Sequence, residues 1–269
     1  MSKQFEELIK VMARLRAPGG CPWDREQTYE SLGEYLLEEC YEAYDAIQKT
    51  SESGDTQHLQ EELGDVLLQV VFHAAIGAEK GDFTIDDVAE GVKTKLILRH
   101  PHVFQDKKLE TADDVLDNWE ELKKNERSER GLEDKASESV LDDIPAAFPA
   151  LIEGNKISKK AAKTGFDWEN TDQIFDKLDE ESSELKRAIE TGEKEMQKEE
   201  IGDLLFVVVN LARKLGVEPE DALKKTNRKF RSRFKFVEER IRKSGSNLED
   251  VELEEMDRLW NEAKAASRR

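Results

Sequence analysis

The segment KEEIGDLLFVVVNLAR at residues 198–213 places carboxylates at the start of a long apolar run. The segment QEELGDVLLQVVF at residues 60–72 repeats this order, with the same Glu-Glu-x-Gly-Asp before a second apolar run. Both runs are too apolar to face water along most of their length, so each predicts a largely buried helix. Because one pattern occurs twice, the chain is interpreted as two copies of one helical module.

The charged positions of the two copies correspond by spacing. Glu38, Glu39 and Glu42 recur 142 positions later in the chain. Glu61, Glu62 and Asp65 recur 138 positions later, and Lys95 and Arg99 recur 134 positions later. The pair Trp119 and Lys123 also matches Trp260 and Lys264 in type and spacing. The separation falls by four residues twice, which predicts that two loops are shorter in the second copy.

Apolar residues at helical spacing predict an all-α fold of two tandem four-helix modules. The expected helices span residues 5–15, 28–48, 59–79, 85–99 and 113–125 in the first copy, and 156–163, 174–189, 195–215, 220–242 and 253–266 in the second. Residues 126–149 are charged and contain Pro145 and Pro149, so they are the predicted linker between modules 1–125 and 150–269.

Length and charge narrow the function classes. The chain has 269 residues, enough for about two domains, and a net charge of -19. That charge argues against sequence-independent nucleic-acid binding, which requires a basic surface. No apolar run approaches the roughly 20 residues that span a bilayer. Cys21 and Cys40 have no metal-type spacing and form no disulfide framework, so the expected location is the cytoplasm.

The carboxylates predict a metal site. Each copy has a Glu-x-x-Glu pair on one helix and a Glu-x-x-Asp pair on the next, and residues three apart share a helix face. Like charges about 4 Å apart repel by about 4 kcal/mol at an effective dielectric of 20, so converging carboxylates need cations. Oxygen ligands suit Mg²⁺, with Mn²⁺ as an alternative. A single pair is common on a solvated helix face, but two ordered pairs in each copy favour metal binding.

Cations follow the carboxylates along the chain. Lys229 and Arg233 are four residues apart on the next helix, where they form either a solvated basic face or contacts to phosphate oxygens. Trp260 is either a packing residue or a base-stacking one. The second copy has Lys177 where the first has Tyr35. It also has more cations on its basic helix, so it is the better phosphate site: Arg228, Arg231 and Lys235 correspond to Thr94, Ile97 and Pro101.

These tandem carboxylate pairs, with GGCPWD at residues 19–24 and GFDW at residues 165–168, resemble the MazG family of nucleoside triphosphate pyrophosphohydrolases. The resemblance covers nearly the whole chain. It implies an all-α homodimer that uses Mg²⁺ to hydrolyse nucleoside triphosphates to the monophosphate and pyrophosphate. In tandem members the second module is held responsible for hydrolysis, and the first is regarded as structural.

Carried over residue by residue, the resemblance implies a catalytic metal site and a substrate site. The metal ligands are Glu181, Glu184, Glu200 and Asp203. The substrate contacts are Lys229, Arg233, Trp260 and Lys264, to which the residues themselves add Lys177. The first copy retains the elements of a second site: Glu39, Glu42, Glu62, Asp65, Lys95 and Arg99.

The resulting hypothesis is broad hydrolysis of NTPs and dNTPs. The ions activate water near the α,β bridge, the cations neutralise phosphate charge, and Glu180 is the candidate general base. Two alternatives stay open: a narrow dUTP or modified-nucleotide pyrophosphatase, and a non-catalytic helical scaffold that binds partner proteins. The sequence leaves open the base and sugar preference, the phosphorus attacked, the physiological substrate, any regulatory partner, and whether the first module is active.

Overall fold

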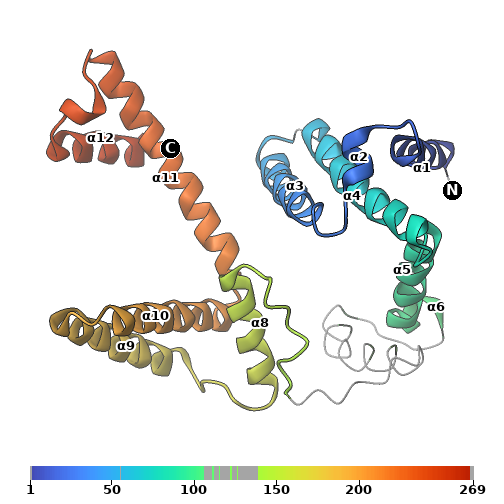
Figure 1. Ribbon diagram of the computed structural model, residues 1–269. Helices are drawn as coiled ribbons and strands as arrows, with labels where there is room; N and C mark the ends of the chain where they lie inside the picture. Colours follow the sequence, from blue (N-terminus) through green and yellow to red (C-terminus); the bar gives the residue numbers. More distant parts are fainter. Residues whose placement is uncertain are drawn as a thin grey trace. The chain divides into compact units, whose positions relative to one another are not determined.

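The computed structural model describes residues 2–54, 56–105, 111, 115, 122, 126 and 139–266 (Figure 1). The chain divides into two compact units, Met1–Asp134 and Lys135–Arg269, here called the first and the second unit. The described residues form helices and no strand, which confirms the all-α prediction. The division falls inside the 126–149 segment, while the exact module limits stay a prediction.

The first unit is built around its fourth helix. The helices are α1 (Lys3–Arg16), α2 (Pro22–Glu26), α3 (Gly33–Ser53), α4 (Gln57–Lys80), α5 (Ile85–Arg99) and α6 (Pro101–Phe104). Helix α3 packs along α4, and α1 and α5 also contact it. Met12, Leu32 and Phe72 belong to the buried core between these helices. The helix expected at residues 113–125 lies mostly outside the described residues.

The second unit repeats the helical pair. Its elements are α8 (Ala150–Lys163), α9 (Thr171–Thr191), α10 (Lys194–Lys214), α11 (Pro219–Lys243), η1 (Leu248–Asp250) and α12 (Leu253–Ala266). Helices α9 and α10 lie side by side, and α8 packs against α10 (Figure 1). Helix α12 folds back on α11 over a separate core of Val237, Ile241 and Leu259. Among the described helices, none has the length and apolarity of a membrane span.

The hairpins that carry the carboxylates end their first helices in the same way. Gly54 after α3 and Gly192 after α9 both have a φ of 75°, the left-handed conformation that glycine adopts without strain. At the other end of α9, the Asn170 side chain accepts a hydrogen bond from the Gln173 backbone N–H at 3.1 Å. These two ends fix where α9 begins and where the chain turns into α10.

The expectation of two shorter loops is wrong, because helix ends absorb most of the length difference. Helix α3 continues to Ser53, eleven residues past Glu42, whereas α9 ends at Thr191, seven past Glu184. Helix α4 has 24 residues and α10 has 21. A turn of α-helix has 3.6 residues, so each change is close to one turn. The carboxylates therefore keep their face although the helices differ in length.

Candidate functional site

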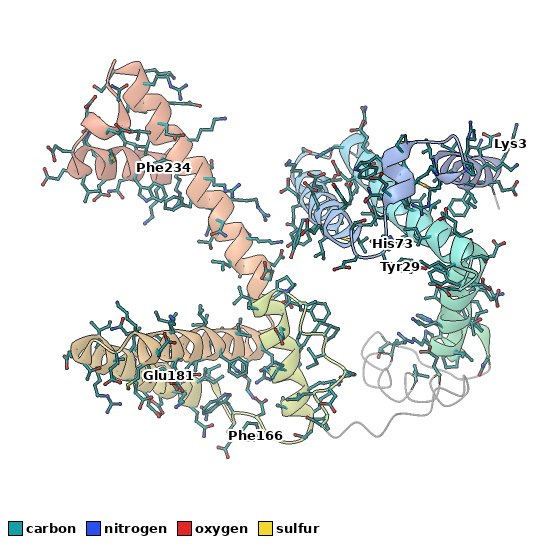
Figure 2. All side chains as sticks on the ribbon, in the orientation of Figure 1. Lys3, Tyr29, His73, Phe166, Glu181 and Phe234 are labelled. Atoms are coloured by element: carbon teal, nitrogen blue, oxygen red, sulfur yellow. The ribbon has the colours of Figure 1, made fainter. Side chains whose placement is uncertain are left out.

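The second unit brings the predicted metal ligands together. One carboxylate oxygen each from Glu181, Glu200 and Asp203 lie within 4.8 Å of one another, and Glu180, Glu181 and Glu184 form a second such group. Glu181 belongs to both groups and is 4% exposed. Figure 2 labels it on α9, beside α10. The two i, i+3 pairs therefore converge across the α9–α10 interface, as their spacing predicts.

Burial and repulsion between the carboxylates of this cluster both affect the pKa of Glu200. Burial raises the pKa of Glu200 above its usual value, and the neighbouring Glu184, Glu181 and Asp203 raise that pKa further. Its Oε2 is shielded from solvent and has no hydrogen-bond partner. A buried carboxylate oxygen without a donor, facing other carboxylates, fits a divalent cation bound by oxygen ligands.

Two cations of α9 lie against the same carboxylates. The Nζ of Lys177 is 2.8 Å from an oxygen of Glu180 and 2.6 Å from one of Glu181. These hydrogen bonds, first that to Glu180, raise the pKa of Lys177 above its usual value. Arg187 pairs with Glu184 at 2.9 Å. The cluster is thus partly neutralised by its own helix, and Lys177 pairs directly with the buried Glu181.

A cavity of about 660 Å³ opens on this cluster. Lys177, Glu181 and Asp203 contribute to its wall. The rest of the lining is mainly apolar: Leu141, Ile157, Ala161, Phe166, Trp168, Phe206 and Val207. Figure 2 labels Phe166 in the segment between α8 and α9. A concave, largely apolar space beside a charged cluster has the character of a small-ligand site.

The aromatic segment of this cavity is held by ion pairs. Asp167 pairs with Arg213, and its Oδ2 is 3.0 Å from the Nζ of Lys214. The hydrogen bond from Arg213 is the largest cause of a pKa lowered to about 2 at Asp167. The Lys214 ammonium also donates to the Trp168 carbonyl at 2.5 Å. Residues 165–168 are therefore anchored to the end of α10.

A buried network continues from Arg213. Its Nε donates to the Ser158 hydroxyl at 2.6 Å, and that hydroxyl donates to Oδ1 of Asn210 at 2.5 Å. The Asn210 amide nitrogen donates to the Phe206 carbonyl at 3.1 Å. Ser158 and Asn210 both line the cavity. Their polar atoms are thus already bonded to protein, and the cavity presents mostly rings and aliphatic groups.

The remaining predicted substrate contacts lie on another pair of helices. Lys229 and Arg233 are on α11, while Trp260 and Lys264 are on α12. Helix α11 leaves the α9–α10 pair at the end of α8, and α12 packs against α11 (Figure 1). Within the described part of the second unit, neither α11 nor α12 packs against α9. One chain therefore does not bring these cations to the carboxylates.

Trp260 packs against side chains of its own unit, while base stacking by this residue stays a prediction. Its ring centroid is 4.9 Å from that of Phe230, and the Arg233 guanidinium lies over the Trp260 ring at 5.8 Å. The buried Nε of Arg233 has no hydrogen-bond partner. The indole therefore fixes the arginine by a cation–π contact.

The first unit forms a cluster of its own. Oxygens of Glu39, Glu62 and Asp65 lie within 4.8 Å of one another. Burial raises the pKa of Glu39, and Asp65, Glu42 and Glu62 add to the shift. Both candidate phosphate contacts of this unit, Lys95 and Arg99, lie on α5. Within the described residues, α5 packs on α4 and not on α3.

Arg99 is engaged by a carboxylate of its own unit. It donates from two nitrogens to Oε2 of Glu126, at 2.7 and 2.9 Å, and Glu126 is 3% exposed.

Sequence reasoning missed two residues of the second-unit cavity, Phe166 and Phe206. The available signal was the aromatic loop next to an aspartate in both copies, which a helix-by-helix reading treats as a connection.

Comparisons with known proteins identify the family of this chain. The family model described as the MazG nucleotide pyrophosphohydrolase domain matches residues 27–104 and 169–237. A Thermotoga maritima protein named nucleoside triphosphate pyrophosphohydrolase/pyrophosphatase MazG is 46% identical over 260 residues, covering 97% of this chain and 95% of that protein.

Two further relatives match almost the whole chain. The nucleoside triphosphate pyrophosphohydrolase of Escherichia coli K12 is 43% identical over 266 residues, covering 97% of each protein. The Bacillus subtilis protein YabN is 48% identical over 267 residues, which are 99% of this chain and 53% of YabN. With two family domains in one chain and relatives of this similarity along nearly its full length, the protein belongs to the MazG family.

Proposed function

We propose that the second unit hydrolyses nucleoside triphosphates to the monophosphate and pyrophosphate. The observation that carries this proposal is the carboxylate cluster of Glu181, Glu200 and Asp203 opening on an apolar cavity that Lys177 also lines. A triphosphate needs neutralising charge, and its nucleoside needs an apolar space next to it. The printed names of the Thermotoga and Escherichia relatives support the reaction class.

Mg²⁺ is the proposed cofactor, with Mn²⁺ as an alternative. Glu181, Glu184, Glu200 and Asp203 would hold it, since they supply only oxygen ligands and Glu200 has a buried oxygen without a partner. When bound, the ions supply charge neutralisation and activation of water.

The chain's own residues have separate proposed tasks. Lys177 would bind and orient the polyphosphate, since a cation held at Glu181 would free its ammonium group for phosphate oxygens. Glu180, at 2.8 Å from Lys177, is the proposed acceptor of the water's proton. Trp168, which is half-buried, would exclude water from the nucleoside side of the cavity, and Phe166, which is 83% exposed, would have to close over a bound nucleoside to do the same.

The cavity supports a broad rather than a narrow substrate range. Reading a base edge requires free donors and acceptors, because an unmatched polar group in a dry pocket is costly. Ser158 and Asn210 are hydrogen-bonded to each other instead. Ser158 also accepts a hydrogen bond from Arg213, and Asn210 donates one to the Phe206 carbonyl. Shape and ring contacts discriminate weakly among bases, so we propose hydrolysis of both NTPs and dNTPs.

A second copy of the chain is the proposed partner. On α10, Ile201, Leu205 and Val208 form a stripe at helical spacing, and each is about half exposed. Exposed apolar stripes of this kind mark association surfaces. The corresponding positions of α4, 138 residues earlier, form the same exposed stripe: Leu63, Leu67 and Val70.

The homodimer would also complete the site. Lys229 and Arg233 lie away from the carboxylates of their own chain, and two-fold symmetry lets each copy offer α11 to the other's α9–α10 pair.

The free thiols Cys21 and Cys40 support a cytoplasmic location. Neither a nucleic acid nor a membrane is proposed as a partner.

The test is release of monophosphate and pyrophosphate from a panel of NTPs and dNTPs, with and without Mg²⁺. Glu200→Gln should lower release by about a hundredfold or more, in line with losing a charge-stabilising group. Its matched control is Glu199→Gln, which removes the same charge from the exposed neighbouring position. Release from a single nucleotide would favour the narrow enzyme, and no release from any would favour the scaffold.

A further inference from the structure

One apolar group in the wall of the second-unit cavity comes from the segment before α8. Residues 139–144 form part of this segment, and Leu141 lines the cavity together with Ile157 and Ala161 of α8. Leu141 is half-buried, whereas its neighbour Val140 is 59% exposed. A segment that the sequence predicted to be part of a linker therefore contributes a side chain to the space proposed for the nucleoside.

A hydrogen-bonded turn presents Leu141 to the cavity. The Ser139 backbone N–H donates to Oδ2 of Asp142 at 3.0 Å, and the Leu141 N–H donates to the Ser139 hydroxyl oxygen at 3.2 Å. The Leu141 carbonyl accepts from the Ile144 N–H at 3.0 Å. Both backbone polar groups of Leu141 are thus bonded within the segment, so its position is fixed without a ligand.

Lys160 joins this turn to α8. Its ammonium group donates to the Val140 carbonyl at 2.8 Å and pairs with the Asp143 carboxylate. These two partners stand on either side of Leu141 in the sequence, one residue before it and two residues after it. Lys160 itself precedes the cavity residue Ala161 on α8. One lysine therefore holds the turn at two points against a helix that also lines the cavity.

Aromatic side chains occupy the matching positions of the first unit. The Trp23 ring contacts the Tyr35 ring edge-on at 5.9 Å between centroids, and the Phe72 ring at 6.4 Å. Tyr35 corresponds to Lys177 and Phe72 corresponds to Asn210, both of which line the second-unit cavity. The open space is thus a feature of the second unit, the unit for which hydrolysis is proposed.

We propose that Leu141 is a nucleoside contact and that Lys160 is the positioning residue that holds Leu141 at the cavity. Both roles rest on the proposed function, and they name the part of the substrate that residues 139–144 recognise. An apolar side chain gains contacts with the rings of a nucleoside, but it offers no hydrogen bond or charge to phosphate oxygens. The turn therefore selects nucleoside triphosphates over polyphosphates that carry no nucleoside.

The test uses the full-length protein with Mg²⁺ and three probes: dATP, a dATP analogue with a non-hydrolysable α,β bridge, and inorganic tripolyphosphate. Leu141→Ala should raise KM for dATP about tenfold and leave kcat within about twofold, because losing an apolar contact weakens ground-state and transition-state binding equally. Its affinity for tripolyphosphate should stay at the wild-type value. Val140→Ala, at the exposed neighbouring position, is the matched control and should change neither quantity.

Substitutions at Lys160 test the positioning role. Lys160→Met should raise KM for dATP about three- to tenfold, and Lys160→Arg should restore it, because a guanidinium also donates to carbonyl and carboxylate oxygens. Lys159→Met removes the same charge from the exposed neighbouring position of α8 and should leave KM nearly unchanged. Adding Lys160→Met to Leu141→Ala should raise KM no further, because Lys160 acts through Leu141.

A further variant covers a failure to fold. If Leu141→Ala does not fold, Asp143→Asn takes its place, since it removes the charge that pairs with Lys160 and leaves the cavity wall intact. It should raise KM for dATP and leave the affinity for tripolyphosphate unchanged. Urea unfolding of each variant identifies those that are folded.

Three results would overturn the proposal. They are a folded Leu141→Ala with the KM of Val140→Ala, an equal loss of affinity for tripolyphosphate and for the dATP analogue, and fully additive effects of Lys160→Met and Leu141→Ala. If the wild type turns over dATP, each of these results contradicts the roles of Leu141 and Lys160 and leaves the proposed function standing. If the wild type hydrolyses no nucleotide, the proposed function fails and these roles fail with it.

Discussion

The ammonium nitrogen of Lys177 lies 2.6 Å from a carboxylate oxygen of Glu181, one helical turn away. Glu181 is the residue shared by both groups of converging oxygens in the second unit. A cation arriving at Glu181 therefore competes with Lys177 for the same carboxylate. Under the proposed function, the displaced lysine would lie beside the incoming phosphates, so metal binding would be coupled to substrate binding.

Replacing Lys177 by Met should lower kcat/KM about ten- to a hundredfold. A hydrogen bond to a charged group is worth about 1.5–3 kcal/mol, and each 1.4 kcal/mol is a factor of ten. Steady-state kinetics would measure the change, with Lys186→Met as control at an exposed position of the same helix. Full activity in Lys177→Met would remove this residue from the phosphate site.

Filling the cavity should raise KM for every nucleotide alike. Ala161 lines the cavity, and Phe in its place would occupy the space proposed for the nucleoside. Losing about 1.4 kcal/mol of uniform binding raises KM about tenfold and leaves kcat nearly unchanged. Ala161→Ser, which adds one small atom, is the control. A KM that stays at the wild-type value in a folded Phe variant would place the nucleoside elsewhere.

The ion pair of Asp167 should contribute to stability at neutral pH. Its pKa is lowered from 3.8 to about 2, chiefly by Arg213. A lowered carboxyl pKa stabilises the folded state above the unfolded value, and this contribution is lost as the pH falls from about 4 towards about 2. With the side chain 24% exposed, solvent screening reduces the effect to about 1–2 kcal/mol.

Asp167→Asn should therefore be less stable than wild type at pH 7, and the difference should shrink as the pH falls below about 4. Urea unfolding across this range measures it. Asp179→Asn, on the exposed side of α9, should show no such pH-dependent gap. A constant difference at all pH values would indicate that packing, and not the charge of Asp167, holds the aromatic segment.

Mixed dimers test whether two copies share one site. Glu200→Gln and Arg233→Gln should each be nearly inactive alone. If Arg233 of one copy serves the carboxylates of the other, a mixed dimer contains one site with both wild-type residues. Random mixing then restores about a quarter of the wild-type activity, as two-fold symmetry requires. Mixed dimers that remain inactive would show that each chain uses its own Arg233.

Local spacing predicted the carboxylate cluster well. Pairs such as Glu200 and Asp203 share a helix face by geometry alone, and their repetition marked which helices matter. The cavity and the Trp23 rings were beyond this reasoning, because both depend on contacts between helices far apart in sequence. The relation of Arg233 to the cluster was unpredictable for the same reason, since its spacing from Lys229 fixes only their common face.

In the first unit, the Trp23 ring contacts the rings of Tyr35 and Phe72, and this packing limits what substitutions there can achieve. The first unit has Tyr35 and Phe72 where the second has Lys177 and Asn210, while both units have the same carboxylates. Opening space at this position is costly, because Phe72 is part of the core, and truncating a buried Phe costs about 3–5 kcal/mol. That is a large share of a domain's total stability of about 5–15 kcal/mol. A second nucleotide cavity in the first unit would therefore have to be opened at the expense of that unit's own stability.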